Sequence, residues 1–498
     1  MLTQFKSTLL PLSLMLGTAL LSGCNSDDNK APTISGDLQP VVAENTLEVG
    51  QYTATDPDND EITLSLSGND SELFTLSAAG LLSFNLAPDF EASDGVLYRL
   101  TITATDDGKD QLSSSIVVSV AIGDVLDPAA LAVVQTDAPD FSSSEVVYID
   151  TLTQQVEPGY YTKGAFQGYT ISSYKQAVFH IGQYFVDTIA KYNTDVPENR
   201  DTQVWEYSTQ DVAQEQSGNP YTLVSLNDNK AYLIRYGSNK VWIVNPQATS
   251  SESFKIGELD LSSYDNENNT QGTPNPAAAV INNGKLFIAM QRQDDDFAPG
   301  AAFVAVFDTV TDQEIETNSS NEDTVKGIPL VGVNPLQNSL VAYGEHIFVT
   351  TPSSLYNAPD LTLSRIEAIN IEDYSLREVL NASDIPENTS NFLRASAIVS
   401  AEQGYFYSTE ELYSPSYTTI STLYEFNPTT GDIISANVNE TGTEAINFID
   451  VDASGFLWVS VANPEAPGVD VINTESNTLQ FNRLPTLLNP NKIEFIGQ

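Results

Sequence analysis

Seven polar residues precede short apolar strand patterns at nearly regular intervals in the later part of the chain. They are Gln167, Asn219, Asn275, Asn338, Arg394, Asn447 and Asn491, and the six intervals from residue 167 to residue 491 average 54 residues. Amide side chains both donate and accept hydrogen bonds, and Arg394 is the one cation of the set. This chemistry suits the binding of a polar ligand, although asparagine also occupies turns and caps for structural reasons alone.

Groups that commonly carry out catalysis are scarce in the sequence. The two histidines, His180 and His346, both lie inside apolar strand patterns, where a core histidine is expected. There is no Gly-x-Ser-x-Gly, His-Glu-x-x-His or phosphate-binding glycine loop, and a single cysteine excludes Cys-x-x-Cys-His haem attachment. With 67 acidic residues, pairs suited to glycoside or lactone hydrolysis occur by chance. Catalysis therefore stays uncertain, and we expect binding instead.

The recurring residues must be positioned by β-structure, because strand patterns repeat from about residue 132 onward without a convincing helical period. A typical unit has a strand at 221–226, a polar turn at 227–229 and an aromatic-rich strand at 231–234, and a second hairpin follows. Four strands per unit predict the blade of a β-propeller. The seven recurring residues predict seven blades, with six or eight as alternatives.

Both ends of residues 132–498 are predicted to share one blade. Residues 492–496 form a single strand, and the strand at 145–149 with its neighbours is expected to supply the outer part, which leaves no exposed sheet edge. Residues 132–498 as a whole resemble the YVTN/quinoprotein-like class of bacterial propellers. That resemblance implies the fold and not the chemistry. Three tryptophans are too few for the repeated tryptophan docking of quinone-cofactor propellers.

The predicted strand order places short and long connections on opposite rims of the propeller. Turns such as 227–229 and 282–284 lie on one rim, and long connections such as 291–300, 351–362 and 409–419 lie on the other, with the seven polar residues. Long loops on one rigid face indicate a binding surface. Tyr356, Tyr413 and Tyr417 are expected to stack on a sugar or a protein partner. The run Asp294–Asp296 either holds a cation or stays solvated.

Residues 32–127 alternate like the strands of a β-sandwich. Their motifs resemble the cadherin family: Glu44-Asn45, Asp56-Pro57-Asp58, Asp89-Phe90-Glu91, Ala104–Gly108 and Asp124–Asp127. The resemblance implies a cadherin-like domain with calcium as a structural cofactor, held by carboxylates from several loops. It places Asp56, Asp58 and Asp106 at one pole, and Glu44, Asp89, Glu91, Asp124 and Asp127 at the other. The alternative is that these acidic loops stay solvated and bind no ion. The sequence also departs from the family motif at Leu126, where the family has an asparagine.

Residues 1–23 predict a lipoprotein signal peptide, with Lys6 before an apolar run that is too short and broken for a membrane span. The run ends in Leu21-Ser22-Gly23-Cys24, which resembles the lipobox of bacterial lipoproteins. That resemblance implies cleavage, acylation of Cys24 by palmitate-type chains, and a polar tether over 24–31. Because Asn25 and not aspartate follows, it implies lipid anchoring at the outer membrane, facing the periplasm or the cell exterior.

The formal net charge of −47 excludes nucleic acid as a partner, because phosphate binding requires a basic surface. The sequence as a whole predicts an all-β chain: a cadherin-like β-sandwich followed by a seven-bladed β-propeller. We expect an acidic, membrane-anchored binding or scaffold lipoprotein that captures a protein, glycan or nutrient, or contacts an outer-membrane protein. The alternatives are a propeller hydrolase or lyase acting on a polysaccharide or lactone, and a calcium-dependent adhesin.

Overall fold

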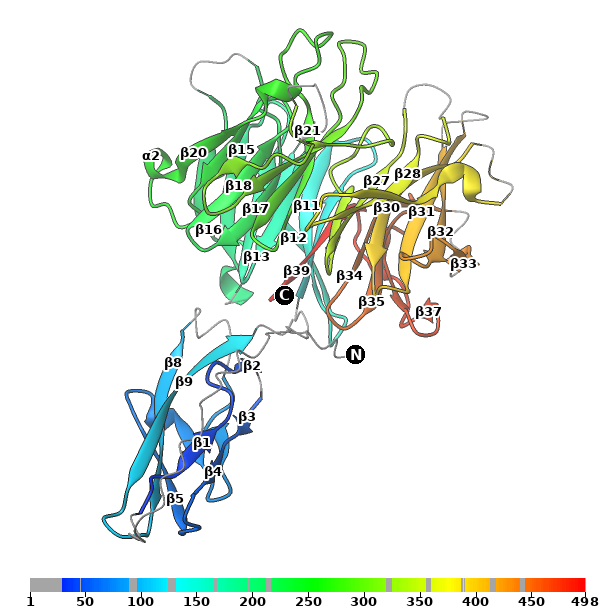
Figure 1. Cartoon of the computed structure of the whole chain (residues 1–498). Helices are drawn as coiled ribbons and strands as arrows, with labels where there is room; N and C mark the ends of the chain where they lie inside the picture. Colours follow the sequence, from blue (N-terminus) through cyan, green and yellow to red (C-terminus); the bar gives the residue numbers. More distant parts are fainter. Residues whose placement is uncertain are drawn as a thin grey trace. The chain divides into compact units, whose positions relative to one another are not determined.

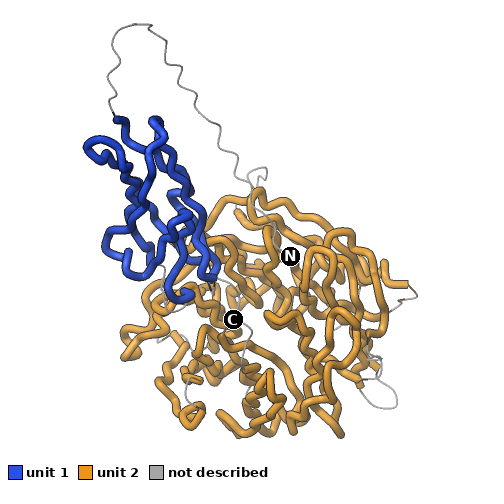
Figure 2. Tube along the Cα trace, turned by 90° about the horizontal axis from the view of Figure 1, so that it is seen from below, with its two compact units in different colours: residues 1–126 blue, residues 127–498 orange. Residues whose placement is uncertain are grey.

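The computed structural model divides the chain into two compact units, residues 1–126 and residues 127–498 (Figure 2). It describes residues 29–497 except 45, 89–95, 124–130, 165–167, 195–196, 212–215, 319–324, 355–359, 387, 389, 413–417 and 439–443. The described helices are single turns, namely α2 (Ser251–Phe254), η1 (Ser71–Leu73), η2 (Pro197–Asn199), η3 (Ser262–Tyr264) and η4 (Ala382–Asp384). None of the described helices has the length and apolar character needed to cross a bilayer.

Unit 1 is a β-sandwich, as predicted. One sheet has the order β2 (Val41–Ala43), β9 (Ser113–Gly123), β8 (Tyr98–Asp106), β5 (Ile62–Ser67). The other has the order β3 (Glu48–Gln51), β7 (Leu81–Phe84), β6 (Phe74–Leu76), and β1 (Thr33–Ser35) pairs with β4 (Thr53–Thr55). Alternate residues of β8 and β9, including Leu100, Ile102, Val118 and Val120, are buried between the sheets, while serines and threonines face solvent.

Unit 2 contains seven antiparallel sheets among its described residues, and each forms one blade (Figure 1). From the inside outward, blade one contains β39 (Asn489–Ile496), β10 (Leu131–Asp137), β11 (Ser143–Asp150) and β12 (Val156–Gly164). Blade two contains β13 (Tyr169–Tyr174), β14 (Ala177–Gly182), β15 (Thr188–Asn193) and β16 (Gln203–Ser208). Blade three contains β17 (Pro220–Asn227), β18 (Lys230–Arg235), β19 (Lys240–Val244) and β20 (Lys255–Asp260).

The remaining blades follow the same order. Blade four contains β21 (Pro276–Asn282), β22 (Lys285–Met290), β23 (Phe303–Asp308) and, both beside β23, β24 (Gln313–Glu314) and β25 (Ile328–Pro329). Blade five contains β26 (Leu340–Tyr343), β27 (His346–Thr351), β28 (Arg365–Asn370) and β29 (Leu376–Asn381). Blade six contains β30 (Phe392–Ile398), β31 (Gly404–Leu412), β32 (Thr418–Phe426) and β33 (Ile433–Ala436). Blade seven contains β34 (Ala445–Val451), β35 (Phe456–Ala462), β36 (Gly468–Asn473) and, both beside β36, β37 (Thr478–Leu479) and β38 (Leu484–Pro485).

Blade one closes the ring in the predicted way. Its inner strand β39 pairs antiparallel with β10, so that Leu131 lies opposite Ile496 and Asp137 lies opposite Asn489. The inner strands contact one another in sequence, and β39 lies between β34 and β13. The seven-bladed propeller is therefore confirmed, and its closure depends on strands from both ends of unit 2.

The cores of unit 2 lie between neighbouring blades. For example, Ile234 and Val241 of blade three pack against Leu286 and Ile288 of blade four, and all four are fully buried. Burying one such side chain stabilises the folded state by about 1.5–3 kcal/mol. Because the chain has a single cysteine, no internal disulfide contributes, and interblade packing dominates the stability of the ring.

Strand direction divides the connections between two rims. On the turn rim, β17 joins β18 through residues 228–229, β21 joins β22 through 283–284, and β26 joins β27 through 344–345. On the opposite loop rim lie residues 138–142, 261–275, 291–302 and 352–364. Two longer connections, 194–202 and 245–254, depart from the pattern and lie on the turn rim. β10 begins and β39 ends at the turn rim.

Candidate binding site on the loop rim

The ring of polar residues predicted from the sequence is divided between two places on the loop rim. Asn338, Arg394, Asn447 and Asn491 line a cavity among the inner strands, which we call the channel cavity. Asn219 and Asn275 line a separate cavity among the loops of blades two to four, which we call the lateral cavity. The seventh member, Gln167, lies outside the described residues.

The channel cavity has a volume of about 400 Å³ and continues into a space of about 320 Å³ deeper among the inner strands. Asn447 Nδ2 donates a hydrogen bond to Asn491 Oδ1 at 2.8 Å, and Asn491 Nδ2 donates to Asp137 Oδ2 at 2.5 Å. The asparagines therefore form a directed chain that ends on a carboxylate. The volume is that of a small-molecule site, and most of the lining residues are polar.

Asp137 is the acid of this cavity. Burial raises the pKa of its carboxyl to about 6, and the hydrogen bonds from Asn491 and Gln135 oppose that shift. Burial also raises the pKa of the Tyr407 hydroxyl to about 12, while the charge of Arg394 and a hydrogen bond with Asn338 lower it. The cavity thus holds a carboxyl that changes protonation near neutrality beside a tyrosine that stays protonated.

Arg394 lies in β30 and is the cation of the channel cavity. Its guanidinium lies 5.1 Å from the centre of the Phe392 ring, and it neither donates a hydrogen bond to the described residues nor forms an ion pair with them. Four arginines of unit 2 form ion pairs; for example, Arg235 contacts Asp211 at 2.8 Å, and Arg483 contacts both Glu444 and Asp470. Arg292 and Arg377 donate to backbone carbonyls instead. In a chain with 67 acidic residues, an arginine without a carboxylate partner in a cavity is available to a ligand.

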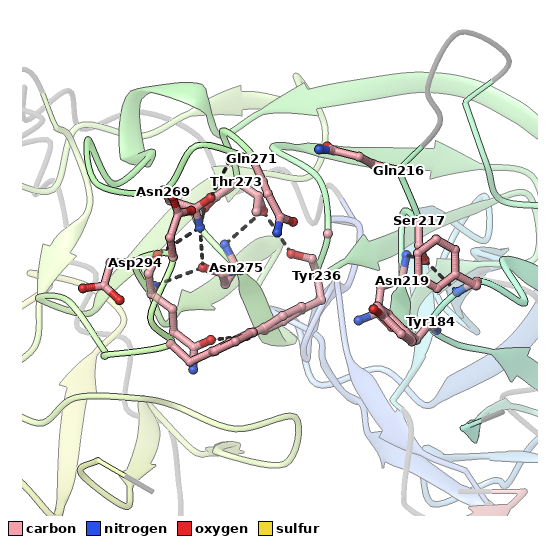
Figure 3. A pocket seen from close by; sticks show the side chains of 15 residues that line it. Tyr184, Gln216, Ser217, Asn219, Tyr236, Asn269, Gln271, Thr273, Asn275 and Asp294 are labelled. Carbon is pink, nitrogen blue, oxygen red and sulfur yellow. Dashed lines mark hydrogen bonds between the residues drawn. The ribbon is translucent and has the colours of Figure 1, made fainter. Parts of the chain in front are cut away.

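The lateral cavity has a volume of about 270 Å³ (Figure 3). Its lining comes from five loop-rim connections, which contribute amides, two carboxylates and aromatic rings: Tyr184, Phe185, Gln216, Ser217, Asn219, Tyr236, Gly237, Asn269, Gln271, Thr273, Asn275, Gln293, Asp294, Asp295 and Phe297. Asn219 and Asn275 adopt positive φ angles of 45° and 52°, which asparagine tolerates better than most residues. They therefore combine the structural role and the cavity-lining role that the sequence left open.

The structure places the remaining predicted residues, namely three tyrosines, an acidic run and a histidine, in different surroundings. Tyr356, Tyr413 and Tyr417 lie outside the described residues. In the run Asp294–Asp296, Asp294 lines the lateral cavity, while Asp295 Oδ1 accepts hydrogen bonds from the backbone and hydroxyl of Thr270. His180 is a core histidine, as expected; burial lowers its pKa to about 3, and it stacks on Tyr169.

The acidic residues predicted at the first pole of unit 1 lie together. Asn29 Nδ2 donates to Asp106 Oδ1 at 2.9 Å, and the Lys30 backbone and ammonium group donate to Asp58. Burial and four neighbouring carboxylates raise the pKa of Asp60. Asn29 Oδ1, Asp56 Oδ2 and Asp106 Oδ2 are buried without a hydrogen-bond partner.

The second predicted pole is seen only in part. Glu44 is buried, whereas Asp89, Glu91, Asp124 and Asp127 lie outside the described residues. Across the part of the chain that the structure describes, no group of three or more His, Cys, Asp or Glu side chains is arranged to hold a metal ion. At the first pole the oxygens without partners come from two carboxylates and one amide.

Sequence reasoning missed several residues of both cavities. Asp137 and Phe141 reach the channel cavity from the first strand of unit 2 and the loop that follows it. Tyr184, Phe185 and Gln293 line the lateral cavity from short loop segments. They do not occupy the position before the first strand of a blade, at which the seven polar residues recur. The repeat therefore did not predict them.

One family model and several solved structures are similar to parts of this chain. Residues 29–121 match the model of a family described as bacterial Ig domain. No curated protein matches the sequence. A solved structure of the periplasmic gluconolactonase of Pseudomonas aeruginosa is 13% identical with a TM-score of 0.46, over 74% of this chain and 99% of that one.

Two further solved structures are similar at a lower level. A streptogramin B lyase is 12% identical with a TM-score of 0.37, over 67% of this chain and 92% of that one. The β-propeller domain of the trilobed protease from Pyrococcus furiosus is 13% identical with a TM-score of 0.34, over 62% of this chain and 82% of that one. With the sheet order described above, the chain consists of an N-terminal Ig-like domain followed by a seven-bladed β-propeller.

Proposed function

We propose that the propeller binds a small hydroxylated ligand that carries a carboxylate, in the channel cavity of its loop rim. The observation that carries this proposal is the guanidinium of Arg394, which lines the cavity without an ion-pair partner among the described residues. A guanidinium binds carboxylates through parallel hydrogen bonds and remains charged at every physiological pH.

The other lining groups support a hydroxylated ligand. Asn338 and Asn491 offer amide groups at fixed positions, and Asn447 offers its Oδ1 as an acceptor, because its Nδ2 donates to Pro490 and Asn491. The Tyr407 hydroxyl donates to the Asn447 backbone carbonyl and can accept from a ligand. A sugar acid combines a carboxylate with several hydroxyls and is small enough for a cavity of about 400 Å³. The role that follows is capture of an acidic sugar or of the acidic end of a glycan.

Isothermal titration calorimetry of the full chain with glucuronate and with glucose tests this proposal. The two sugars differ by a carboxylate in place of a hydroxymethyl group, so the cavity should prefer glucuronate by about tenfold or more, because a charged hydrogen bond is worth about 1.5–3 kcal/mol. Equal affinities, or no binding of either sugar, would count against the proposal.

A hydrolase or lyase is the second candidate function, and Asp137 is the observation that favours it. A carboxyl with a pKa of about 6 in a ligand-sized cavity suits proton transfer near neutrality. Turnover of a panel of lactones and acidic polysaccharides, lost in Asp137→Asn, would establish this function. Failure of the wild-type chain to convert any member would leave binding as the role of the cavity.

We also propose that the first pole of unit 1 binds calcium. The residues that would hold it are Asn29, Asp56 and Asp106, because each has a buried oxygen without a hydrogen-bond partner, and Asp60 lies beside them. Calcium takes six to eight oxygen ligands, so a bound ion would neutralise this concentration of charge. The role is structural, and an adhesive role for unit 1 would depend on it.

Attachment to the outer membrane through acylated Cys24 is proposed from the sequence, since residues 1–28 lie outside the described part of the chain. The first strand of unit 2, β10, begins at the turn rim. The loop rim carries both cavities and would contact a ligand, a glycan or an outer-membrane protein. Stable anchoring needs more than one acyl chain, which a mature lipoprotein supplies.

A further inference from the structure

The lateral cavity is separate from the channel cavity. The two sets of lining residues have no member in common. The lateral cavity is built by the loops of blades two to four, and Figure 3 shows its labelled side chains in two groups, one around Asn275 and one around Asn219. Its chemistry also differs, because its lining contains no Arg, Lys or His.

Asn275 forms the best-defined polar group of this cavity. Its side chain is 6% exposed, and its Oδ1 accepts a hydrogen bond from the backbone N–H of Gln293 at 3.0 Å. A backbone N–H can only donate, so the orientation of the amide is fixed with Oδ1 on that side. Its Nδ2 donates to none of the described residues and remains at the lateral cavity (Figure 3).

Asn219 repeats this arrangement on the other side of the cavity. Its Oδ1 accepts from the backbone N–H of Tyr184 at 2.9 Å, so its Nδ2 is also left without a partner among the described residues. Asp294 supplies an acceptor: its Oδ1 receives the backbone N–H groups of Asp296 and Ala298, both at 2.9 Å, and no described donor reaches its Oδ2. Two fixed donors and one carboxylate match the hydroxyls of a sugar.

Tyr184 and Phe185 give the cavity an apolar wall. Their side chains are 63% and 61% exposed, and their rings meet edge-on with centroids 4.4 Å apart. Exposed aromatic rings beside the amides of Asn219 and Asn275 suit a ligand with one apolar face and several hydroxyls. An anion is disfavoured here, because Asp294 and Asp295 carry the only charges of the lining.

We propose that the lateral cavity binds one ring of a neutral glycan, with its C–H face on Tyr184 or Phe185 and its hydroxyls on Asn219, Asn275 and Asp294. This site goes beyond the anion site proposed for the channel cavity and does not depend on it. Together the two cavities would give the loop rim a charged and an uncharged subsite.

The test is binding of neutral gluco-, galacto-, manno- and xylo-oligosaccharides to the full chain, screened on an array and measured by calorimetry. Tyr184→Ala removes the wall, and Asn275→Asp keeps the shape and the Oδ1 acceptor but removes the Nδ2 donor. We expect each variant to weaken binding of the best oligosaccharide by about tenfold, the equivalent of about one aromatic contact or one hydrogen bond.

Leu487→Ala is the matched control, because Leu487 is 69% exposed in the loop-rim connection between β38 and β39 and lines neither cavity. It should leave neutral-glycan binding unchanged, and unchanged melting temperatures should show that all variants fold. The proposal is overturned if no neutral oligosaccharide binds, if Tyr184→Ala and Asn275→Asp bind like the wild-type chain, or if Arg394→Gln abolishes the binding. The last result would place the glycan in the channel cavity.

Discussion

Asn491 donates a hydrogen bond to Asp137 at 2.5 Å although 354 positions separate them in the sequence. Asn491 belongs to the last strand of the ring and Asp137 to the first, so this contact forms only when blade one closes. The channel cavity is lined by both residues. Ring closure and construction of the proposed binding site are therefore the same structural event.

Weakening the closing strand should destabilise the whole propeller. Phe495 is buried in β39 and meets the Trp458 ring edge-on at 5.5 Å. Phe495→Ala should lower the free energy of unfolding of unit 2 by about 3–5 kcal/mol, as is usual for a large-to-small core substitution. Urea unfolding followed by tryptophan fluorescence reports this, because Trp205, Trp242 and Trp458 all lie in unit 2.

Leu152→Ala is the control for the closing strand, because Leu152 is highly exposed in the turn after β11. It should change the stability by no more than about 0.5 kcal/mol. Equal effects of the two substitutions would show that β39 does not close the ring.

Binding in the channel cavity should depend on pH through Asp137. Its carboxyl has a pKa of about 6, so it is neutral below that pH and negatively charged above it. A carboxylate ligand stays ionised throughout and is repelled only when Asp137 is charged. Affinity for glucuronate should therefore rise by about threefold to tenfold between about pH 8 and pH 5, with a midpoint near pH 6.

The Asp137→Asn variant provides the control for this pH dependence. It keeps a side chain that can accept from Asn491 but cannot become charged, so the affinity should stay constant over the same range. A pH profile that is the same in the variant would assign the titration to another group.

Calcium should stabilise unit 1 if the buried oxygens without partners are its ligands. Adding calcium to chelator-treated protein should raise the melting temperature of unit 1 by about 4–8 °C per kcal/mol of binding free energy, as measured by calorimetry. Asp106→Asn should abolish the shift. Asp110→Asn removes the same charge from an exposed residue with positive φ and should leave it intact; identical behaviour of the two variants would contradict the proposed ligands.

Acylation of Cys24 predicts where the chain is found in a bacterial cell. The wild-type chain should incorporate labelled palmitate and sediment with outer membranes, whereas Cys24→Ser should do neither. A wild-type chain that is unlabelled and remains in the soluble fraction would exclude the anchor.

The sequence predicted the architecture because blades repeat a local pattern. Each blade of unit 2 carries its own alternating strands and turn residues. The closure of blade one was predicted because residues 492–496 form a single strand that needs partners from elsewhere in the chain. Residues at the repeated position, such as Asn275 and Arg394, were found for the same reason. Their division between two cavities was not predictable, because it depends on how neighbouring loops fold over the rim.

The rest of the site depends on tertiary contacts that leave no periodic signal. Asp137 becomes a cavity residue only when the two ends of unit 2 pair, and its raised pKa follows from that burial. Tyr184 and Phe185 belong to a loop of five residues between β14 and β15, and their exposure beside Asn219 depends on a loop of another blade. Local sequence patterns do not encode such contacts.

Calorimetry of an Arg394 variant with two sugars shows whether Arg394 binds a carboxylate. Arg394→Gln should lose at least about tenfold in affinity for glucuronate while its affinity for glucose stays the same. Arg99→Gln removes the same charge from an exposed position in unit 1 and should bind both sugars like the wild-type chain. If Arg394→Gln binds glucuronate as tightly as Arg99→Gln does, Arg394 does not bind the carboxylate.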